Sequence, residues 1–208
     1  MGRVIESLAD VEEGAAWLAA REPRFAAALD ETGPWPLRRK PDGFPALLDA
    51  IVGQQVSTAA AQAIAGRLRT AGLWGEAEIA AADEDRLRAA GLSRPKARYA
   101  LAIARAGVDW AALRGASDGE VVETLVALPG IGRWTAEIYA MFALGRPDVL
   151  AAGDLALQEA ARALFDLATR PGEADLRALA AAWSPWRAVA ARGLWAYYRH
   201  LKSREGIL

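Results

Sequence analysis

The stretch that decides the fold is Leu128-Pro129-Gly130-Ile131-Gly132-Arg133-Trp134-Thr135-Ala136. It lies between two segments with apolar residues at helical spacing, 118–127 and 133–144, so it predicts a tight turn between two helices. Its two glycines permit positive φ and keep side chains out of the path of a ligand. Backbone N–H groups at the start of the second helix, together with the helix dipole, suit a phosphate. The stretch is therefore either a plain turn with a glycine C-cap or a phosphate-binding hairpin.

Helix is the expected element along the rest of the chain. Alanine and leucine dominate, β-branched residues are sparse, and no segment alternates as a strand would. The expected helices are Leu8–Leu29 with a break near Pro23, Phe44–Ala71 with a fresh start at Ser57 or Thr58, Asp83–Ala90, Pro95–Arg105, Asp118–Ala127, Arg133–Leu144, one from Asp154, Glu173–Trp183 and Trp186–Lys202. The predicted fold class is all-α.

Composition excludes several kinds of site. The chain has 208 residues, enough for one domain or two small lobes, and it has no cysteine. Disulfides, cysteine-based zinc sites and iron–sulfur clusters are thereby removed, and the single histidine, His200, makes a histidine-rich metal site unexpected. The N-terminus lacks the pattern of a signal peptide, and Trp134–Leu144 is too short to span a bilayer. We expect a cytoplasmic protein with no membrane partner.

The net charge of −1 argues mildly against a nucleic-acid-binding role. Basic residues nevertheless cluster at Arg38–Lys40, at Arg94–Arg98 and from Arg187 to Arg204, so a folded chain could present a basic face. Ordinary solvated helix faces explain any one of these clusters equally well.

Asp154 follows a glycine-containing loop and precedes an apolar-periodic helix. From the residues alone it is an N-cap aspartate, the commonest role of aspartate at a helix start.

Five ordered segments carry a family resemblance. They are Phe44–Ser57, Gly91–Ala97, Leu128–Ala136, Asp148–Asp154 and Trp183–Arg187. In combination the chain resembles the helix–hairpin–helix DNA glycosylases, in particular the 3-methyladenine DNA glycosylase II family. The resemblance implies a core of two helical lobes with the active-site cleft between them. Residues 44–143 would form the central lobe with the hairpin, and 1–43 plus 144–208 the second lobe. The N-terminal β-rich domain of longer relatives has no room in this chain.

The resemblance implies that Asp154 is the catalytic carboxylate of a monofunctional glycosylase that excises alkylated bases in base excision repair. Breaking an N-glycosidic bond builds positive charge on the sugar, and a fixed carboxylate near C1′ would stabilise that charge and could orient the attacking water. An alkylated purine leaves easily, so general-acid help is less necessary.

The same resemblance implies residues that hold the flipped base. Trp134 and Trp195 match aromatic residues of the base pocket, whose indole faces would favour a cationic base. Ile138 stands where some relatives place a tyrosine, which would leave a roomier pocket. Gln55 falls at the position of the wedge that fills the gap in the duplex, with Gln54 beside it. Core packing is the alternative for both tryptophans.

Contacts with the DNA backbone are expected from the hairpin and its surroundings. The residues are Leu128, Gly130, Ile131, Gly132, Arg133, Thr135 and Lys96; Arg133 and Lys96 could equally be solvated charges. No cofactor and no side-chain metal site are expected, although hairpin backbone carbonyls could hold a monovalent ion. The expected partner is double-stranded DNA with alkylated bases, and a monomer is sufficient for one lesion.

Two alternatives to this function remain. A bifunctional glycosylase with lyase activity needs a lysine nucleophile on the second helix of the hairpin, and Arg133–Glu137 contains none; Thr135 stands near its place. A noncatalytic helix–hairpin–helix DNA-binding module would have no need of an acid at Asp154. A helical interaction domain without a DNA role would leave the joint occurrence of the five segments unexplained.

Overall fold

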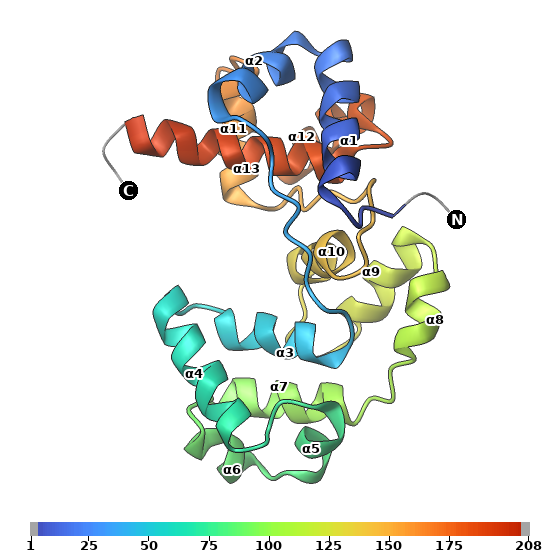
Figure 1. Cartoon of the computed structure of the whole chain (residues 1–208). Coiled ribbons are helices and arrows are strands. Elements are labelled where there is room, and N and C mark those ends of the chain that lie inside the picture. The colour runs from blue at the N-terminus through green and yellow to red at the C-terminus, as the bar shows by residue number, and fades with distance from the viewer. Residues whose placement is uncertain (1–3, 205–208) are drawn as a thin grey trace. The chain divides into compact units, whose positions relative to one another are not determined.

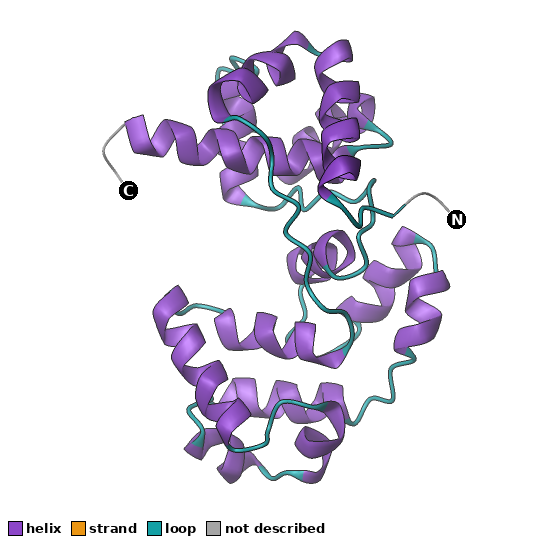
Figure 2. Ribbon diagram, in the orientation of Figure 1, coloured by secondary structure: helices purple, strands orange, loops and turns teal. Residues whose placement is uncertain are grey.

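The computed structural model describes residues 4–204, and within that range every regular element is a helix (Figures 1 and 2). The predicted all-α class is therefore confirmed. The chain divides into two compact units. The first unit consists of two stretches of the chain, residues 4–39 and 140–204. The second unit is Lys40–Tyr139. The lobe boundaries expected from the sequence, 44 and 143, lie four residues further along the chain.

The first unit is built around its last helix. Its helices are α1 (Leu8–Arg21), α2 (Pro23–Thr32), α11 (Leu155–Leu164), α12 (Glu173–Leu179), the 3-10 turn η1 (Ala180–Trp183) and α13 (Arg187–Arg204). α13 packs against α1, α2 and α11 (Figure 1). The ring of Phe25 meets Trp183 edge-on at 5.2 Å and contacts Phe165 in the same way, so an aromatic cluster fills this core. The expected break near Pro23 is confirmed, because proline begins α2 where its missing N–H costs nothing.

The second unit packs its helices around α7. They are α3 (Phe44–Gly53), α4 (Thr58–Thr70), α5 (Glu76–Ala81), α6 (Glu84–Ala89), α7 (Arg94–Ala104), α8 (Trp110–Gly115), α9 (Asp118–Val126) and the first part of α10 (Arg133–Phe142). α7 contacts α3, α5 and α6, and its small residues Ala97 and Ala100 are fully buried at these contacts. The fresh start at Ser57 and the capping box of Ser117 with Glu120 are both present as expected.

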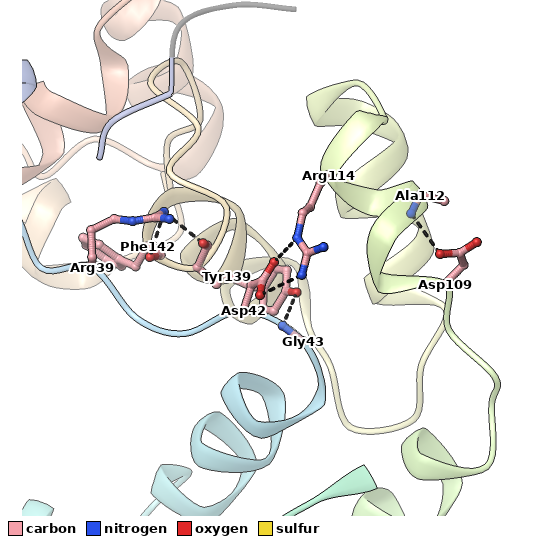
Figure 3. Close-up of polar contacts among 9 residues, drawn as sticks. Arg39, Asp42, Gly43, Asp109, Ala112, Arg114, Tyr139 and Phe142 are labelled. Carbon is pink, nitrogen blue, oxygen red and sulfur yellow. Dashed lines mark hydrogen bonds and ion pairs between the residues drawn. The ribbon is translucent and has the colours of Figure 1, made fainter. Parts of the chain in front are cut away.

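Two helices of this unit are absent from the sequence expectation, α5 and α8, and on that point the expectation is wrong. Each has six residues, less than two turns, which is too short for an apolar period to show. Helix α6 is equally short, but Gly91 marks its end in the sequence. α8 is fixed locally instead, because the carboxylate of its N-cap Asp109 accepts the backbone N–H of Ala112 at 2.9 Å (Figure 3).

The entry to α3 is fixed by two polar contacts within the second unit. Gly43 has a φ of 86°, and its N–H donates to the Tyr139 hydroxyl at 2.9 Å. Next to it, Asp42 pairs with the guanidinium of Arg114 (Figure 3). Burial raises the pKa of Tyr139 to about 12, so the phenol is neutral when it accepts this bond. These contacts fix the start of α3.

In the first unit, two arginine side chains bind backbone carbonyls from several segments. Arg39 donates to the carbonyls of Phe142 (Figure 3) and Ala143, at 3.4 and 2.9 Å. Arg192, only 1% exposed, donates to carbonyls of Ala188 on its own helix and Leu37 of the 33–43 connector, at 2.7 and 3.2 Å. Burial and the positive charge of neighbouring arginines lower the Arg192 pKa to about 10, which leaves it protonated at neutral pH. The guanidinium thus fastens connector and helix together in a water-excluded core.

Candidate active site

Asp154 stands directly before α11 as its N-cap. Its Oδ1 accepts the backbone N–H groups of Ala156 at 2.9 Å and Leu157 at 3.0 Å. The capping role deduced from the residues alone is therefore confirmed. The two hydrogen bonds also fix the orientation of the carboxylate, because both hold the same oxygen, Oδ1, at the N-terminus of the helix.

A third donor on the same oxygen comes from α13. The indole Nε1–H of Trp195 lies 3.2 Å from Asp154 Oδ1, and the indole ring packs against Phe142 at a centroid distance of 5.7 Å. Trp195 is therefore a partner of the carboxylate, whereas its expected place in the base pocket stays a prediction. Its contact with Asp154 spans 41 positions in the sequence, and no local pattern indicates it.

The loop that leads to Asp154 is anchored by an ion pair that the sequence analysis missed. Asp148 accepts two hydrogen bonds from Arg187, both at 2.8 Å, and a third from the Ser184 hydroxyl at 2.8 Å. Burial opposes ionisation of Asp148, but the bonds from Arg187 and Ser184 outweigh it and lower its pKa. Two of the segments that carry the family resemblance, Asp148–Asp154 and Trp183–Arg187, are thus joined here.

In the hairpin, the apolar side chains anchor the turn in the core, and the glycines leave its backbone accessible to a ligand. The side chains of Leu128 and Ile131 are buried, so only their backbone can meet a ligand. Gly130 has a φ of 81° and lies against the Tyr99 ring, where a Cβ atom would come within 2.4 Å. Gly132 is exposed, a Cβ on it would meet nothing within 4 Å, and its carbonyl accepts the N–H of Ala136 at the start of α10. This is the geometry of a backbone that can approach a phosphate at a helix N-terminus.

Two expected backbone contacts lie just after the turn. Arg133 is 59% exposed and pairs with Glu137 at 3.0 Å, and the Glu137 side chain is 3% exposed. The buried carboxylate of Glu137 accepts the Nε–H of Arg133, whose side chain is exposed. Thr135 is buried, and it faces a pocket rather than the solvent.

That pocket lies in the second unit and measures 490 Å³, within the range of ligand sites. Its wall includes Trp134 and Ile138 from α10, Gln54 after α3, and charged residues among which are Asp49 and Arg69. Trp134 is 45% exposed, and a large exposed indole beside a pocket is typical of a binding surface. The structure therefore brings Trp134, Ile138 and Gln54 to one hollow.

The turn between α3 and α4 contains both glutamines expected at the wedge. The Gln54 side chain donates to the carbonyl of Gly130 at 3.0 Å, so it is committed to the hairpin. Gln55 is exposed and has a φ of 54°, a left-handed conformation that is uncommon for a residue with a side chain. Lys96 is half-buried, and its Nζ donates to the carbonyls of Val52 and Gln54 at 2.9 and 2.7 Å. Gln55 is thus the more exposed of the two glutamines, and its role as the wedge stays a prediction.

The expected site residues fall into two groups. Asp154 and Trp195 meet in the first unit, while the hairpin, Trp134, Ile138 and the two glutamines belong to the second. Among residues 4–204 no three histidine or acidic side chains gather as a metal site would require. In the same range, no helix combines the length and apolar character that crossing a membrane demands.

Comparison with known proteins agrees with this geometry. Residues 48–186 match the family HhH-GPD, described as the HhH-GPD superfamily base excision DNA repair protein. A Schizosaccharomyces pombe relative named alkylbase DNA glycosidase-like protein mag2 is 27% identical over 86% of this chain and 89% of its own length.

Two solved structures are similar over most of their length. The crystal structure of a DNA-3-methyladenine glycosidase from Bacillus halodurans has a TM-score of 0.80 and 34% identity, over 89% of each chain. The Schizosaccharomyces pombe 3-methyladenine DNA glycosylase Mag1, solved in complex with abasic DNA, has a TM-score of 0.75 and 27% identity, over 88% of this chain and 95% of that one.

Proposed function

Because the chain belongs to the HhH-GPD superfamily of base excision DNA repair proteins, we propose that it is a monofunctional glycosylase that excises alkylated bases of the 3-methyladenine type from duplex DNA. The observation that carries the proposal is the carboxylate of Asp154, which receives three N–H donors from α11 and α13 on one oxygen. The names of the similar proteins, an alkylbase DNA glycosidase-like protein and two enzymes named for 3-methyladenine, support the same substrates.

The held carboxylate suits the proposed reaction. As the bond between C1′ and the base breaks, positive charge grows on the sugar, and a negative group already in position stabilises it without reorganising. Ala156, Leu157 and Trp195 fix the orientation of Asp154 before any substrate arrives. A base alkylated on a ring nitrogen already carries positive charge. It takes the electrons of the breaking bond and departs as a neutral molecule, so no acid is needed beside it.

The hairpin provides the grip on DNA. The backbone at Gly130 and Gly132 is open to close approach, and the N-terminus of the ten-residue helix α10 attracts a phosphate. Neutral carbonyl oxygens such as those of the hairpin are suitable ligands for a monovalent ion, which would supply positive charge to the phosphate. The Gly130 carbonyl already accepts the Gln54 amide, which leaves one lone pair for such an ion.

The pocket beside Trp134 would receive part of the flipped base. An exposed indole face attracts a cationic alkylpurine over a neutral base by roughly 0.5–2 kcal/mol per contact. Ile138 adds an apolar wall with no hydrogen-bond donor, so shape and charge would select the base. One chain carries both groups of residues, and we propose that it acts as a monomer on one lesion.

The monofunctional assignment rests on where the lysines lie in the chain. The chain has three, Lys40, Lys96 and Lys202, and none lies on α10, where a lyase would carry its Schiff-base nucleophile.

The experiment is base release from methylated duplex DNA, followed by borohydride treatment of an abasic-site duplex. We expect free 3-methyladenine and 7-methylguanine and no covalent adduct. A trapped adduct would show a lyase. Tight DNA binding without base release would show the noncatalytic module.

A further inference from the structure

Lys96 joins helix α7 to the end of helix α3. It is the third residue of α7, and its ammonium group donates to two carbonyls, of Val52 at 2.9 Å and of Gln54 at 2.7 Å. Both carbonyls lie at the C-terminus of α3, the negative end of that helix. A cation placed there fixes the direction in which the chain leaves the helix.

The residue held by Lys96 is itself bonded to the hairpin. Gln54 offers its backbone carbonyl to Lys96 and donates its side-chain amide to the carbonyl of Gly130 at 3.0 Å. α7 reaches the hairpin a second time, because the Tyr99 ring lies against Gly130. One face of α7 therefore supports both the α3–α4 turn (54–57) and the hairpin.

This arrangement accounts for the strained residue in the turn. Gln55 keeps a positive φ although it has a side chain, and its neighbour Gln54 is fixed on both its backbone and its side chain. Left-handed backbone at such a residue persists where the surroundings hold it, and it is common at ligand-binding positions.

We propose that Lys96 is a positioning residue, which locks the α3–α4 turn to the hairpin so that Gln55 is held at a fixed offset from the phosphate-binding backbone. The proposal rests on the proposed function, since it assigns the turn and the hairpin to one DNA-binding surface. Lys96 then acts through Gln54 and makes no ion pair with a phosphate. Partial burial lowers the Lys96 pKa, in keeping with an ammonium that lies against the two carbonyls.

The salt dependence of DNA binding separates the two roles of Lys96. Each cation that neutralises a phosphate contributes about 0.9 to the slope of log K against log salt. For Lys96→Met we expect the slope on undamaged duplex to equal that of the wild type, whereas Arg133→Gln, the matched change at a predicted phosphate contact, should lower it by about 0.9. A Lys96→Met slope that is smaller by the same amount would overturn the proposal.

The link to the hairpin is tested with a double-mutant cycle. The measured quantity is the preference for a duplex with a tetrahydrofuran abasic site over undamaged duplex, because a positioned wedge matters where a base is missing. We expect Lys96→Met and Gln54→Ala each to reduce that preference about tenfold, and the double variant to lose no more than the larger single effect. Additive losses would show that the two residues act separately and would contradict the proposal.

Neither the salt slope nor the abasic-site preference requires catalysis. A failure of base release would therefore count against the proposed function, while both measurements would still test the role of Lys96. If Lys96→Met does not fold, as judged by its thermal unfolding, Lys96→Arg takes its place. An arginine keeps the charge but presents a planar fork to carbonyls that a compact ammonium bridges. It should keep the salt slope and still reduce the abasic-site preference; an unchanged preference would contradict a positioning role.

Discussion

At the scale of single residues, one oxygen of Asp154 combines a structural and a proposed chemical role. The backbone bonds of Ala156 and Leu157 are those of any N-cap, and the Trp195 indole adds a donor that no cap requires. A cap residue is ordinarily replaceable by serine or asparagine at small cost. Because the same atoms fix the carboxylate, a change that spares the fold can still remove the proposed chemistry.

Trp195→Phe isolates the indole donor. The phenyl ring can still pack against Phe142, but the hydrogen bond to Asp154 Oδ1 is lost. We expect single-turnover base release to slow by about tenfold while thermal stability changes by less than about 1 kcal/mol. An unchanged rate would place the indole outside the machinery of the carboxylate.

Gly130 and Gly132 form a matched pair in the hairpin. Gly130→Ala puts a Cβ atom into the Tyr99 ring at positive φ, so we expect a loss of about 1–3 kcal/mol in unfolding free energy together with weaker DNA binding. Gly132 directly precedes α10, and Gly132→Ala meets open space, so the change should cost only about 0.5–1 kcal/mol, the preference for glycine over alanine at an N-cap. Urea denaturation measures both, and equal losses would contradict this assignment of the turn.

At the scale of elements, sequence patterns predicted those turns, caps and helix breaks that depend on neighbouring residues. The hairpin, the Ser117 capping box and the break at Pro23 all follow from residues within one or two turns of each other. The six-residue helices α5 and α8 were not predicted, because so short a segment shows no period; α6 has the same length and was predicted from the glycine that follows it. The pair Asp148–Arg187 and the contact of Lys96 with α3 could not be predicted either, since each depends on packing between segments about 40 residues apart.

The Asp148–Arg187 pair should make stability depend on pH in the acid range. The pKa of Asp148 is lower in the folded chain than its ordinary value of 3.8, so the pair stabilises the fold above that pH and is lost as the pH falls through the folded value. Asp148→Asn should cost about 1–3 kcal/mol at pH 7, reduced toward the lower figure because the pair is partly exposed. The variant should lose less stability than the wild type between pH 5 and pH 2, which thermal unfolding across that range measures; equal losses would contradict the assignment.

At the scale of the whole molecule, a net charge of −1 has to be reconciled with binding a polyanion. The hairpin offers backbone N–H groups and a helix dipole, which need no net positive charge. The family could be predicted from ordered motifs, and the roles of single residues in gripping DNA, flipping the base and cleaving its bond stay proposals. Which partner each side chain takes could not: Trp195, Gln54 and Lys96 all bind protein atoms that their expected roles do not mention.

A weak salt dependence follows for DNA binding. With the grip supplied mainly by backbone groups and by about two to four cations at phosphates, we expect a slope of log K against log salt between about −2 and −4 on undamaged duplex. Fluorescence anisotropy between about 50 and 300 mM salt gives the slope. A value steeper than about −6 would require a broad basic face and would contradict a backbone-centred grip.

The most direct test of the central claim is single-turnover release of 7-methylguanine by the wild type and by Asp154→Asn, with binding to a tetrahydrofuran duplex measured on both proteins. Asparagine can still cap α11, so the variant should fold and bind the abasic-site duplex about as tightly as the wild type. It should lose base release by a factor of about 10³ or more, since the negative charge that stabilises the sugar is gone. Equal rates of base release from the two proteins would contradict Asp154 as the catalytic carboxylate.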